Sequence, residues 1–261
     1  MSVIHFRKLL IGATLIASAA TPAFSADLYD SAYEAPAPSF SGWYLRGHVG
    51  MSNQHVKELQ YEYFDVPGFS HNWLDEGGFD SAPIGGVGIG YAFNNWLRAD
   101  ITGEYRGKSS FHALDSFTND ATGDVIGTNQ YSATKSEWLV LANAYIDLGE
   151  FNGISPYIGA GIGASRNTIA NLDDINEFAG GGGYASKDSK WDLAWALHAG
   201  VGYAVSDRMT MDLGYSFVHL GDGKTGPARN YDPNLTRPND GFTFKDIYSH
   251  DFKLGLRYKF N

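Results

Sequence analysis

The stretch from residue 252 to residue 260 alternates between two chemically different faces. One parity holds the apolar side chains Phe252, Leu254, Leu256, Tyr258 and Phe260. The other parity holds Lys253, Gly255, Arg257 and Lys259. Because successive side chains of a strand point to opposite sides, this segment predicts a ribbon with one apolar face that ends in aromatic rings and one cationic face. A chain built from such strands must place the apolar face in an apolar environment and the cationic face in a polar one.

The same alternation recurs in seven earlier segments, and the connections between segments are long and short in turn. The strands are expected at 43–51, 84–93, 97–106, 137–148, 157–165, 191–205, 210–217 and 252–260. The long loops are expected at 52–82, 108–134, 169–189 and 222–245. An even strand number with short turns at one end and long loops at the other is typical of bacterial outer-membrane barrels. We therefore predict an all-β fold, an eight-stranded antiparallel transmembrane β-barrel with short periplasmic turns and long extracellular loops.

The apolar parity is assigned to lipid because the opposite parity is rich in glycine. A soluble β-sandwich or lipocalin-like barrel is the alternative, and it would turn the apolar parity inward and need a polar exterior. Glycines make a poor solvent-facing surface but suit a crowded interior. They occur at Gly86, Gly88, Gly90, Gly159, Gly161, Gly163, Gly200 and Gly202.

The N-terminus predicts export. Two cations precede an apolar run over residues 9–20, and Ala23 and Ser25 are the small residues before the expected cleavage point. This pattern is typical of a secretory signal peptide, and the run is too short for a spanning helix. No cysteine is present, so no disulfide contributes to stability. We expect a signal peptide at 1–25, a periplasmic lead-in at 26–39 and the barrel at 40–261.

The net charge is acidic and excludes one class of partner. The chain has 19 Lys+Arg and 29 Asp+Glu, and removal of residues 1–25 takes away two cations, which leaves 17 − 29 = −12. Nucleic acid is therefore not an expected partner, because its recognition needs a basic surface. The first three long loops sum to −5, −2 and −3 and the fourth to +1. From this charge we expect divalent cations at the outer loops, shared with lipopolysaccharide phosphates.

Charged residues of both signs share the face that we assign to the lumen. An eight-stranded interior is just wide enough to be filled by side chains, and unpaired buried charge is costly. We expect interlocked ion pairs that plug the lumen, with a narrow solute pore as the alternative. The members of this expected polar network are Arg46, Arg98, Asp100, Glu104, Arg106, Glu137, Asp147, Asp192, Asp212, Lys253, Arg257 and Lys259.

The sequence contains no pattern that points to a catalytic or metal site. The histidines are scattered without metal-ligand spacing, and the alternating glycines lack the spacing of a dinucleotide loop. His55 and His71 lie in the first expected loop with several aromatic residues, and such a cluster could hold hemin by axial imidazole and stacking. Loop decoration is the simpler interpretation. We expect no enzyme activity, no metal and no cofactor.

Four short motifs, in the right order along the chain, carry a resemblance to a known family. They are Ala26-Asp27-Leu28, Phe40-Ser41-Gly42-Trp43-Tyr44, Pro156-Tyr157-Ile158-Gly159-Ala160-Gly161-Ile162-Gly163 and Leu256-Arg257-Tyr258-Lys259-Phe260. The chain resembles the small outer-membrane β-barrel family of alphaproteobacteria, which is related to opacity-type surface antigens and to the membrane domain of outer-membrane protein A. The resemblance covers essentially all of the chain after the signal peptide.

The resemblance implies a structural protein of the Gram-negative outer membrane that contributes to envelope integrity and displays extracellular loops as a surface antigen. Its partners would be outer-membrane lipid, lipopolysaccharide and the barrel-insertion machinery, which reads a terminal aromatic signal, here Tyr258 and Phe260. Asn261 follows that signal, whereas the aromatic usually ends the chain in this family. Porin-like or hemin-binding behaviour, reported for some members, is the alternative function.

Overall fold

The structure is a computed structural model that describes residues 41–65, 67–176, 181–234 and 241–260. The expected signal peptide, the lead-in and Asn261 lie outside the described residues. Twelve strands and one short 3-10 helix are present in the described part. They are β1 (Gly42–His55), β2 (Glu58–Gln60), η1 (Glu62–Asp65), β3 (Phe69–Phe79), β4 (Ala82–Ala92), β5 (Leu97–Asn119), β6 (Val125–Asp147), β7 (Ile154–Asn176), β8 (Gly181–Ala185), β9 (Asp188–Ala204), β10 (Met209–Lys224), β11 (Ala228–Asn230) and β12 (Thr243–Lys259).

Eight of these strands close into a ring of antiparallel pairs. The order is β1-β4-β5-β6-β7-β9-β10-β12, and β12 returns to β1 from Tyr44↔Lys259 to His55↔Tyr248. The pairing of β7 with β9, which begins at Ile154↔Tyr203, completes the circle. Every backbone group inside the ring therefore has a neighbour to bond with, as a hydrocarbon environment requires. The predicted eight-stranded antiparallel barrel is confirmed.

The expected facing of the strands is also confirmed over the ring. Trp43, Val87 and Leu197 are all more than half exposed on the outside of the barrel, whereas Tyr44 and Ala196 on the opposite parity are buried. Leu139 and Leu141, which share the inward parity of β6, are likewise buried. The outer surface of the ring is thus a continuous apolar band, and the interior contains small and polar residues together with a few larger side chains such as Leu139 and Leu141.

The expected loop boundaries are wrong, because the strands continue well beyond the apolar band. The segment 52–82 contains β2, η1 and β3, and β5 and β6 occupy most of 108–134. Similarly, β7, β8 and β9 cover most of 169–189, and β10, β11 and β12 enter 222–245. Polar residues and glycines in these stretches resemble loop sequences, yet the backbone pairing that begins in the ring is simply extended outside it. The short turns after β4, β6 and β9 lie where they are expected.

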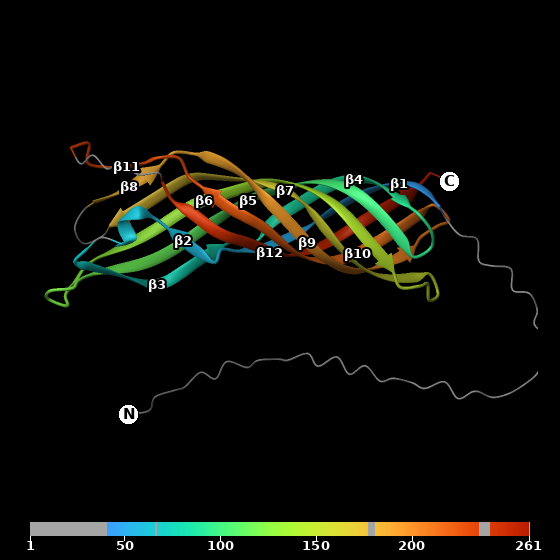
Figure 1. The fold of residues 1–261 in the computed structure, drawn as a ribbon, viewed down its shortest axis with the longest axis horizontal. Helices are drawn as coiled ribbons and strands as arrows, with labels where there is room; N and C mark the ends of the chain where they lie inside the picture. Colours follow the sequence, from blue (N-terminus) through green and yellow to red (C-terminus); the bar gives the residue numbers. More distant parts are fainter. Residues whose placement is uncertain (1–40, 66, 177–180, 235–240, 261) are drawn as a thin grey trace, which may run out of the picture. The chain divides into compact units, whose positions relative to one another are not determined.

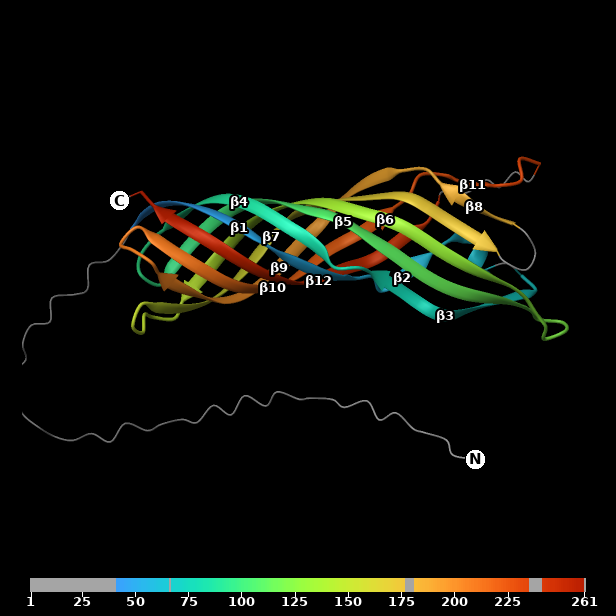
Figure 2. The same cartoon turned by 180° about the vertical axis from the view of Figure 1, so that it is seen from behind.

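Figures 1 and 2 both show β2, β3, β8 and β11 at one end of the barrel, away from the C-terminal end of β12. These four strands are attached to the ring strands by pairing: β2 to β12, β3 to β5, β8 to β7, and β11 to β8. We call this end, with the parts of β5, β6, β7, β10 and β12 that reach it, the outer extension. None of the helical segments among the described residues is long and apolar enough to cross a membrane.

The outer extension has an apolar interior, in contrast to the ring below it. Phe111, Phe244 and Ile247 are fully buried there, within a cluster to which β2, β3, β5, β6, β7, β8, β10, β11 and β12 all contribute. In β5 a register shift between Arg106 and Ser109 exchanges the inward and outward parities. Residues on odd positions, which face outward in the ring, therefore face inward beyond the shift.

Three other strands exchange parity in the same zone, and in β7 the exchange is at Asn171, which has a φ of 52° and lies within a register shift against β6. β10 does so around Gly221, whose φ of 67° is in the left-handed region and whose neighbours show register shifts on both sides. β12 does so at Asp246, which has a φ of 48°. Each irregularity consumes one residue, and this is enough to redirect every side chain that follows.

Candidate functional site

The largest buried charge cluster surrounds Arg106 of β5. Its guanidinium contacts three carboxylates: Asp251 at 2.6 Å, Glu104 at 2.7 Å and Glu137 at 3.2 Å. Lys253 bonds Glu104 at 2.6 Å, so the cluster joins β5, β6 and β12 across the interior. Because all these side chains are nearly inaccessible to water, their charges are compensated only by one another.

The cluster continues through residues that the sequence reasoning missed. His48 Nε2 lies 2.7 Å from Glu104, and the Ser52 and Ser249 hydroxyls accept hydrogen bonds from Arg106. Lys135 forms an ion pair with Glu137 and donates to Gln54 Oε1 at 2.8 Å. Parity could have found them, because each lies an even number of positions from an expected network residue of its own strand.

A second group of polar contacts centres on Asp100. Its carboxylate accepts hydrogen bonds from Arg46 and from the Tyr44 hydroxyl, both at 3.0 Å, and from Asn143 at 2.8 Å. Arg46 also donates to the Tyr145 hydroxyl at 2.8 Å. Tyr44, Tyr145 and Asn143 were not part of the expected network, although they share the inward parity of their strands.

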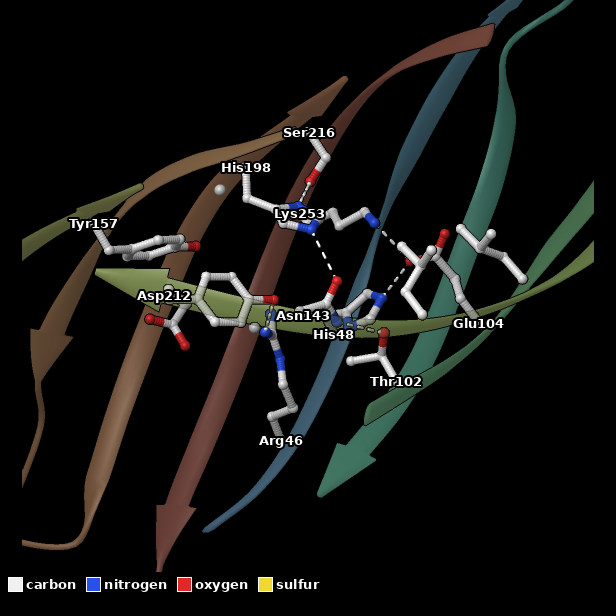
Figure 3. Close-up of a pocket in the computed structure, with 15 residues that line it drawn as sticks. Arg46, His48, Thr102, Glu104, Asn143, Tyr157, His198, Asp212, Ser216 and Lys253 are labelled. Atoms are coloured by element: carbon white, nitrogen blue, oxygen red, sulfur yellow. Dashed lines mark hydrogen bonds and ion pairs between the residues drawn. The ribbon is translucent and has the colours of Figure 1, made fainter. Parts of the chain in front are cut away.

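Between these two groups lies a small polar cavity of about 30 Å³, shown in Figure 3. Its walls include Arg46, His48, Glu104, His198 and Lys253, which approach from β1, β5, β9 and β12. One water needs about 10–15 Å³ of such space, so the cavity has room for about two. Around this cavity the lumen is therefore filled by side chains.

The contacts of His198 with Ser216 and Asn143 resemble part of a nucleophilic catalytic site. The Nδ1 of His198 lies 2.8 Å from the Ser216 hydroxyl and its Nε2 lies 3.1 Å from the Asn143 amide oxygen, as Figure 3 shows. A hydroxyl, an imidazole and an orienting partner are the parts of a nucleophilic site. Here they adjoin only the small cavity, which has no room for a substrate beside the hydroxyl. The arrangement serves as a hydrogen-bonded cross-link between β6, β9 and β10.

Two further expected pairs complete the lower lumen. Arg257 binds Asp212 through two hydrogen bonds of 2.7 and 2.9 Å, and Arg98 Nε lies 3.1 Å from both oxygens of Asp147. The rest of the Arg98 guanidinium lies over the rings of Tyr145 and Tyr157, at 4.1 and 4.7 Å from their centroids. Cation–π contacts of this kind stabilise a desolvated guanidinium.

Two members of the expected network lie apart from the others. Asp192 bonds Lys190 at 2.8 Å, and the same lysine contacts Asp222 at 3.0 Å, close to the outer extension. Lys259 is half-buried at the last position of β12. The expected assembly signal, Tyr258 and Phe260, is exposed on the outer face, with ring centroids 5.9 Å apart. Nothing else in the structure bears on its recognition.

The lumen is closed a second time where the ring meets the outer extension. Lys135 Nζ, at the top of the Arg106 cluster, lies 5.6 Å from the Phe79 ring centroid. Phe79 in turn packs against Phe111 and Phe244, with centroid separations of 5.3 and 5.6 Å. A layer of paired charge is thus directly covered by a layer of aromatic side chains.

The expected hemin ligands have separate surroundings. His55 stacks on Tyr248 with centroids 5.2 Å apart, at the end of β1. His71 of β3 has its Nε2 2.7 Å from Asp115 and stacks on Phe64 at 4.3 Å. Within the described ranges, no group of three or more His, Cys, Asp or Glu side chains could hold a metal ion. Cation binding at the outer loops therefore stays a prediction from charge.

Asp222, on the surface of the outer extension, is an ion-paired carboxylate with a displaced pKa. Partial burial raises the pKa of Asp222, but hydrogen bonds from Lys245, from the Asp246 backbone and from Lys190 lower it to about 2. Lys245 Nζ lies 2.9 Å from the Asp222 carboxylate. This group ties β10 to β9 and β12 at the level where the parities exchange.

A closed antiparallel ring with an apolar exterior and a polar, filled interior defines the class of transmembrane β-barrels. Residues 11–260 match the model of the family described as outer membrane protein beta-barrel domain. The chain belongs to this family, and it is a protein of the outer membrane.

Its relatives include bacterial surface proteins. An uncharacterized protein of Brucella melitensis is 29% identical over 250 residues, which cover 86% of this chain and 87% of that protein. The outer membrane protein PagN of Salmonella typhimurium is 29% identical over 189 residues, covering 67% of this chain and 72% of PagN. A putative adhesin of Rickettsia bellii is 25% identical, covering 69% of this chain and 75% of the adhesin.

Among solved structures, the outer membrane protein OprG of Pseudomonas aeruginosa gives a TM-score of 0.46 at 12% identity. The matched region covers 84% of this chain and 97% of OprG.

Proposed function

We propose that this protein is a non-conducting outer-membrane barrel that contributes to the envelope and displays its outer extension as a contact surface for other macromolecules. The observation that carries the proposal is the double closure of the lumen. The charges around Arg106 compensate one another, and the aromatic layer of Phe79, Phe111 and Phe244 covers them. A path for solutes would have to break both layers.

The outer extension supports the contact role because it is ordered by its own apolar core. Leu59 of the short strand β2, Phe244 at the start of β12 and Phe242 just before it are buried in that core. A surface that is held in one shape loses less conformational entropy when it binds a partner. The putative adhesins among the relatives favour adhesion as the kind of contact.

Conductance across a planar bilayer tests the first half of the proposal. Purified folded protein should give no stable single-channel steps, and protein unfolded by heat in the same detergent is the control for leakage. A reproducible unit conductance would support the alternative function, a small-solute porin, and would remove the proposed one. A heat-modifiable shift on gels should first show that the inserted protein is a closed barrel.

Adherence of bacteria tests the second half. A strain without adhesins of its own should adhere several-fold better to coated or cellular surfaces when it displays the full chain. Equal adherence with and without the displayed chain would contradict the contact role. The hemin alternative is not part of the proposal, since His55 stacks on Tyr248 whereas His71 contacts Asp115 and Phe64.

A further inference from the structure

Among the described residues, the outer extension has three strands that are paired on one side only: β2, β3 and the three-residue β11. In the described part of the chain β3 pairs with β5 and with no other strand, and β2 pairs with β12 and with no other strand. A strand edge of this kind presents main-chain donors and acceptors that can pair with another polypeptide. The ring itself has no such edge, because it is closed.

The hydrogen bonds around β3 show which of its main-chain groups form the free edge. The Gly68 carbonyl accepts from the Asp120 amide, whereas the Asn119 amide donates to Asp124, toward β6. In an antiparallel pair, residues alternate between facing the partner and facing away from it. The main-chain groups of Phe69, which is paired with Asn119, therefore point away from β5. By the same alternation those of His71 and Trp73 point away as well.

This free edge lacks three of the features that usually protect one: lysine, proline and a bulge. Natural edges are protected by lysine, proline, bulges or a covering segment. The run from Phe69 to Trp73 contains no lysine and no proline, and its register with β5 is regular. The irregularities of β3 come only later, between Trp73 and Gly78.

Residues of β2, η1 and β3 line a common open groove of about 900 Å³ beside this edge. Part of its wall is aromatic. The Phe64 ring lies 4.3 Å from His71 and 5.5 Å from Trp73, measured between ring centroids. Rings of this kind accept both apolar side chains and cations.

The groove is acidic. Glu58 and Glu62 line it, and no Lys or Arg does. The nearest cations along the strands are already paired: Lys57 with Asp246 at 3.5 Å, and Lys245 with Asp222 at 2.9 Å. Charge complementarity therefore favours a partner with positive charge.

We propose that the outer extension captures an extended, basic polypeptide segment, which adds as a strand to the free edge of β3. The main-chain groups of Phe69, His71 and Trp73 supply the hydrogen bonds, and the carboxylates of Glu58 and Glu62 attract lysine or arginine side chains of the segment. Strand addition takes its affinity from main-chain bonds and its selectivity from the side chains that flank them. This inference rests on the contact role proposed above and names the class of partner.

Fluorescence anisotropy with defined peptides tests the proposal on the purified full chain, folded in detergent. The probe is a labelled peptide of about ten residues in which Lys and Val alternate, a length suited to a single strand. It should bind saturably and more weakly as salt increases. The same peptide with every amide N-methylated cannot donate to a strand edge and should bind at least about tenfold more weakly. A peptide in which Glu replaces Lys should not bind.

Two variants locate the binding on the protein. His71→Pro removes one outward amide of β3 and leaves its main-chain bonds to β5 in place, but it also removes the side chain that contacts Asp115. His71→Ala loses the same side chain and keeps the amide, so it is the control, and His71→Pro should bind about tenfold more weakly than His71→Ala. The double variant Glu58→Gln with Glu62→Gln should weaken the Lys-Val peptide by roughly threefold and leave a Thr-Val peptide unchanged. Asp207→Asn removes a carboxylate from the turn after β9, at the opposite end of the barrel, and should change nothing.

Equal binding of the N-methylated and unmethylated peptides would overturn strand addition. Equal binding of the Thr-Val and Lys-Val peptides would overturn the basic character of the partner. Self-association of the chain that is abolished by His71→Pro, without peptide binding, would assign the edge to a second copy and overturn the proposal. If the peptides do not bind but the bacteria still adhere, strand addition at β3 is wrong and the proposed function is retained. If the barrel conducts but binds the Lys-Val peptide, the proposed non-conducting function is wrong and strand addition is retained.

Discussion

The ring and the outer extension share several long strands, yet the ring has its apolar side chains outside and the outer extension has them inside. In the ring, β5 points Ile101 outward and buries Asp100 and Glu104. In the outer extension the same strand buries Phe111 and exposes His112. The surrounding medium explains the difference: hydrocarbon favours an apolar exterior, whereas water favours an apolar interior. One strand meets both demands because a register shift exchanges its two faces on the way.

The comparison also shows how the interior of each region is held together. In the ring, cohesion comes from ion pairs that are expensive to leave incomplete. In the outer extension it comes from apolar burial, as in a soluble domain. The two kinds of interior meet at Lys135 and Phe79. Substitutions in the ring should therefore destabilise the protein by breaking ion pairs, and substitutions in the outer extension should do so by removing apolar contacts.

The largest expected effect is that of Arg106→Met. The change removes the cation shared by Glu104, Glu137 and Asp251 and leaves carboxylates buried without compensation. We expect a loss of about 5 kcal/mol, the upper end of the range for a broken buried ion pair. Urea unfolding in lipid vesicles, followed by the heat-modifiable gel shift, measures it. Arg208→Met in the exposed turn after β9 is the control, and a similar loss in both variants would show that the cluster does not hold the ring.

Phe111→Ala tests the apolar interior of the outer extension. Phe111 is fully buried between Phe79 and Phe244, and its truncation should cost roughly 3–4 kcal/mol through lost transfer energy and the cavity that remains. Because the ring below keeps its ion pairs, the closed-barrel gel shift should persist while protease cuts the outer extension sooner. His112→Ala, on the exposed side of the same strand, should change neither readout. Protection equal to the wild type would contradict a packed core.

Leu197→Arg and Val125→Arg compare the exteriors of the two regions. Both side chains are more than half exposed, but Leu197 lies in the middle of β9 and Val125 begins β6 at its outer end. The first variant places a cation in hydrocarbon and should cost about 2–4 kcal/mol. The second places it in water and should cost less than about 0.5 kcal/mol. Equal costs, measured by urea titration in vesicles, would contradict the assigned position of the membrane.

The sequence predicts the ring well because alternation is strongest where one face meets lipid. The lumen-facing positions follow from the same parity, which is why Arg46, Glu104 and Arg257 are found among ion-paired interior side chains. The companions His48 and Asp251 were missed. Asp251 lies one residue before the expected start of the closing strand, although its parity is the same as that of Lys253.

The outer extension could not be predicted in this way. Its strands carry polar residues outward and small or aromatic residues inward, and the parity exchange at the β5 register shift, at Gly221 and at Asp246 interrupts each pattern. The alternation on a single parity therefore stops at these positions, and the sequence beyond them resembles a loop. The free edge of β3 is even harder to predict from the sequence, because it depends on which strands do not pair with β3.

The smallest expected effect is a dependence on pH at the level where the faces exchange. Asp222 has a pKa of about 2 in the folded chain, below its value of about 4 when unfolded. A depressed pKa contributes stability that is fully present above the unfolded value and is lost as the pH falls from about 4 to about 2. The contribution should stay below about 1 kcal/mol because the group is partly exposed. Asp222→Asn should lower the urea midpoint slightly at pH 7 and leave it nearly equal to that of the wild type at pH 2. A constant difference across this range would mean that the ion pairs with Lys190 and Lys245 do not join the two regions.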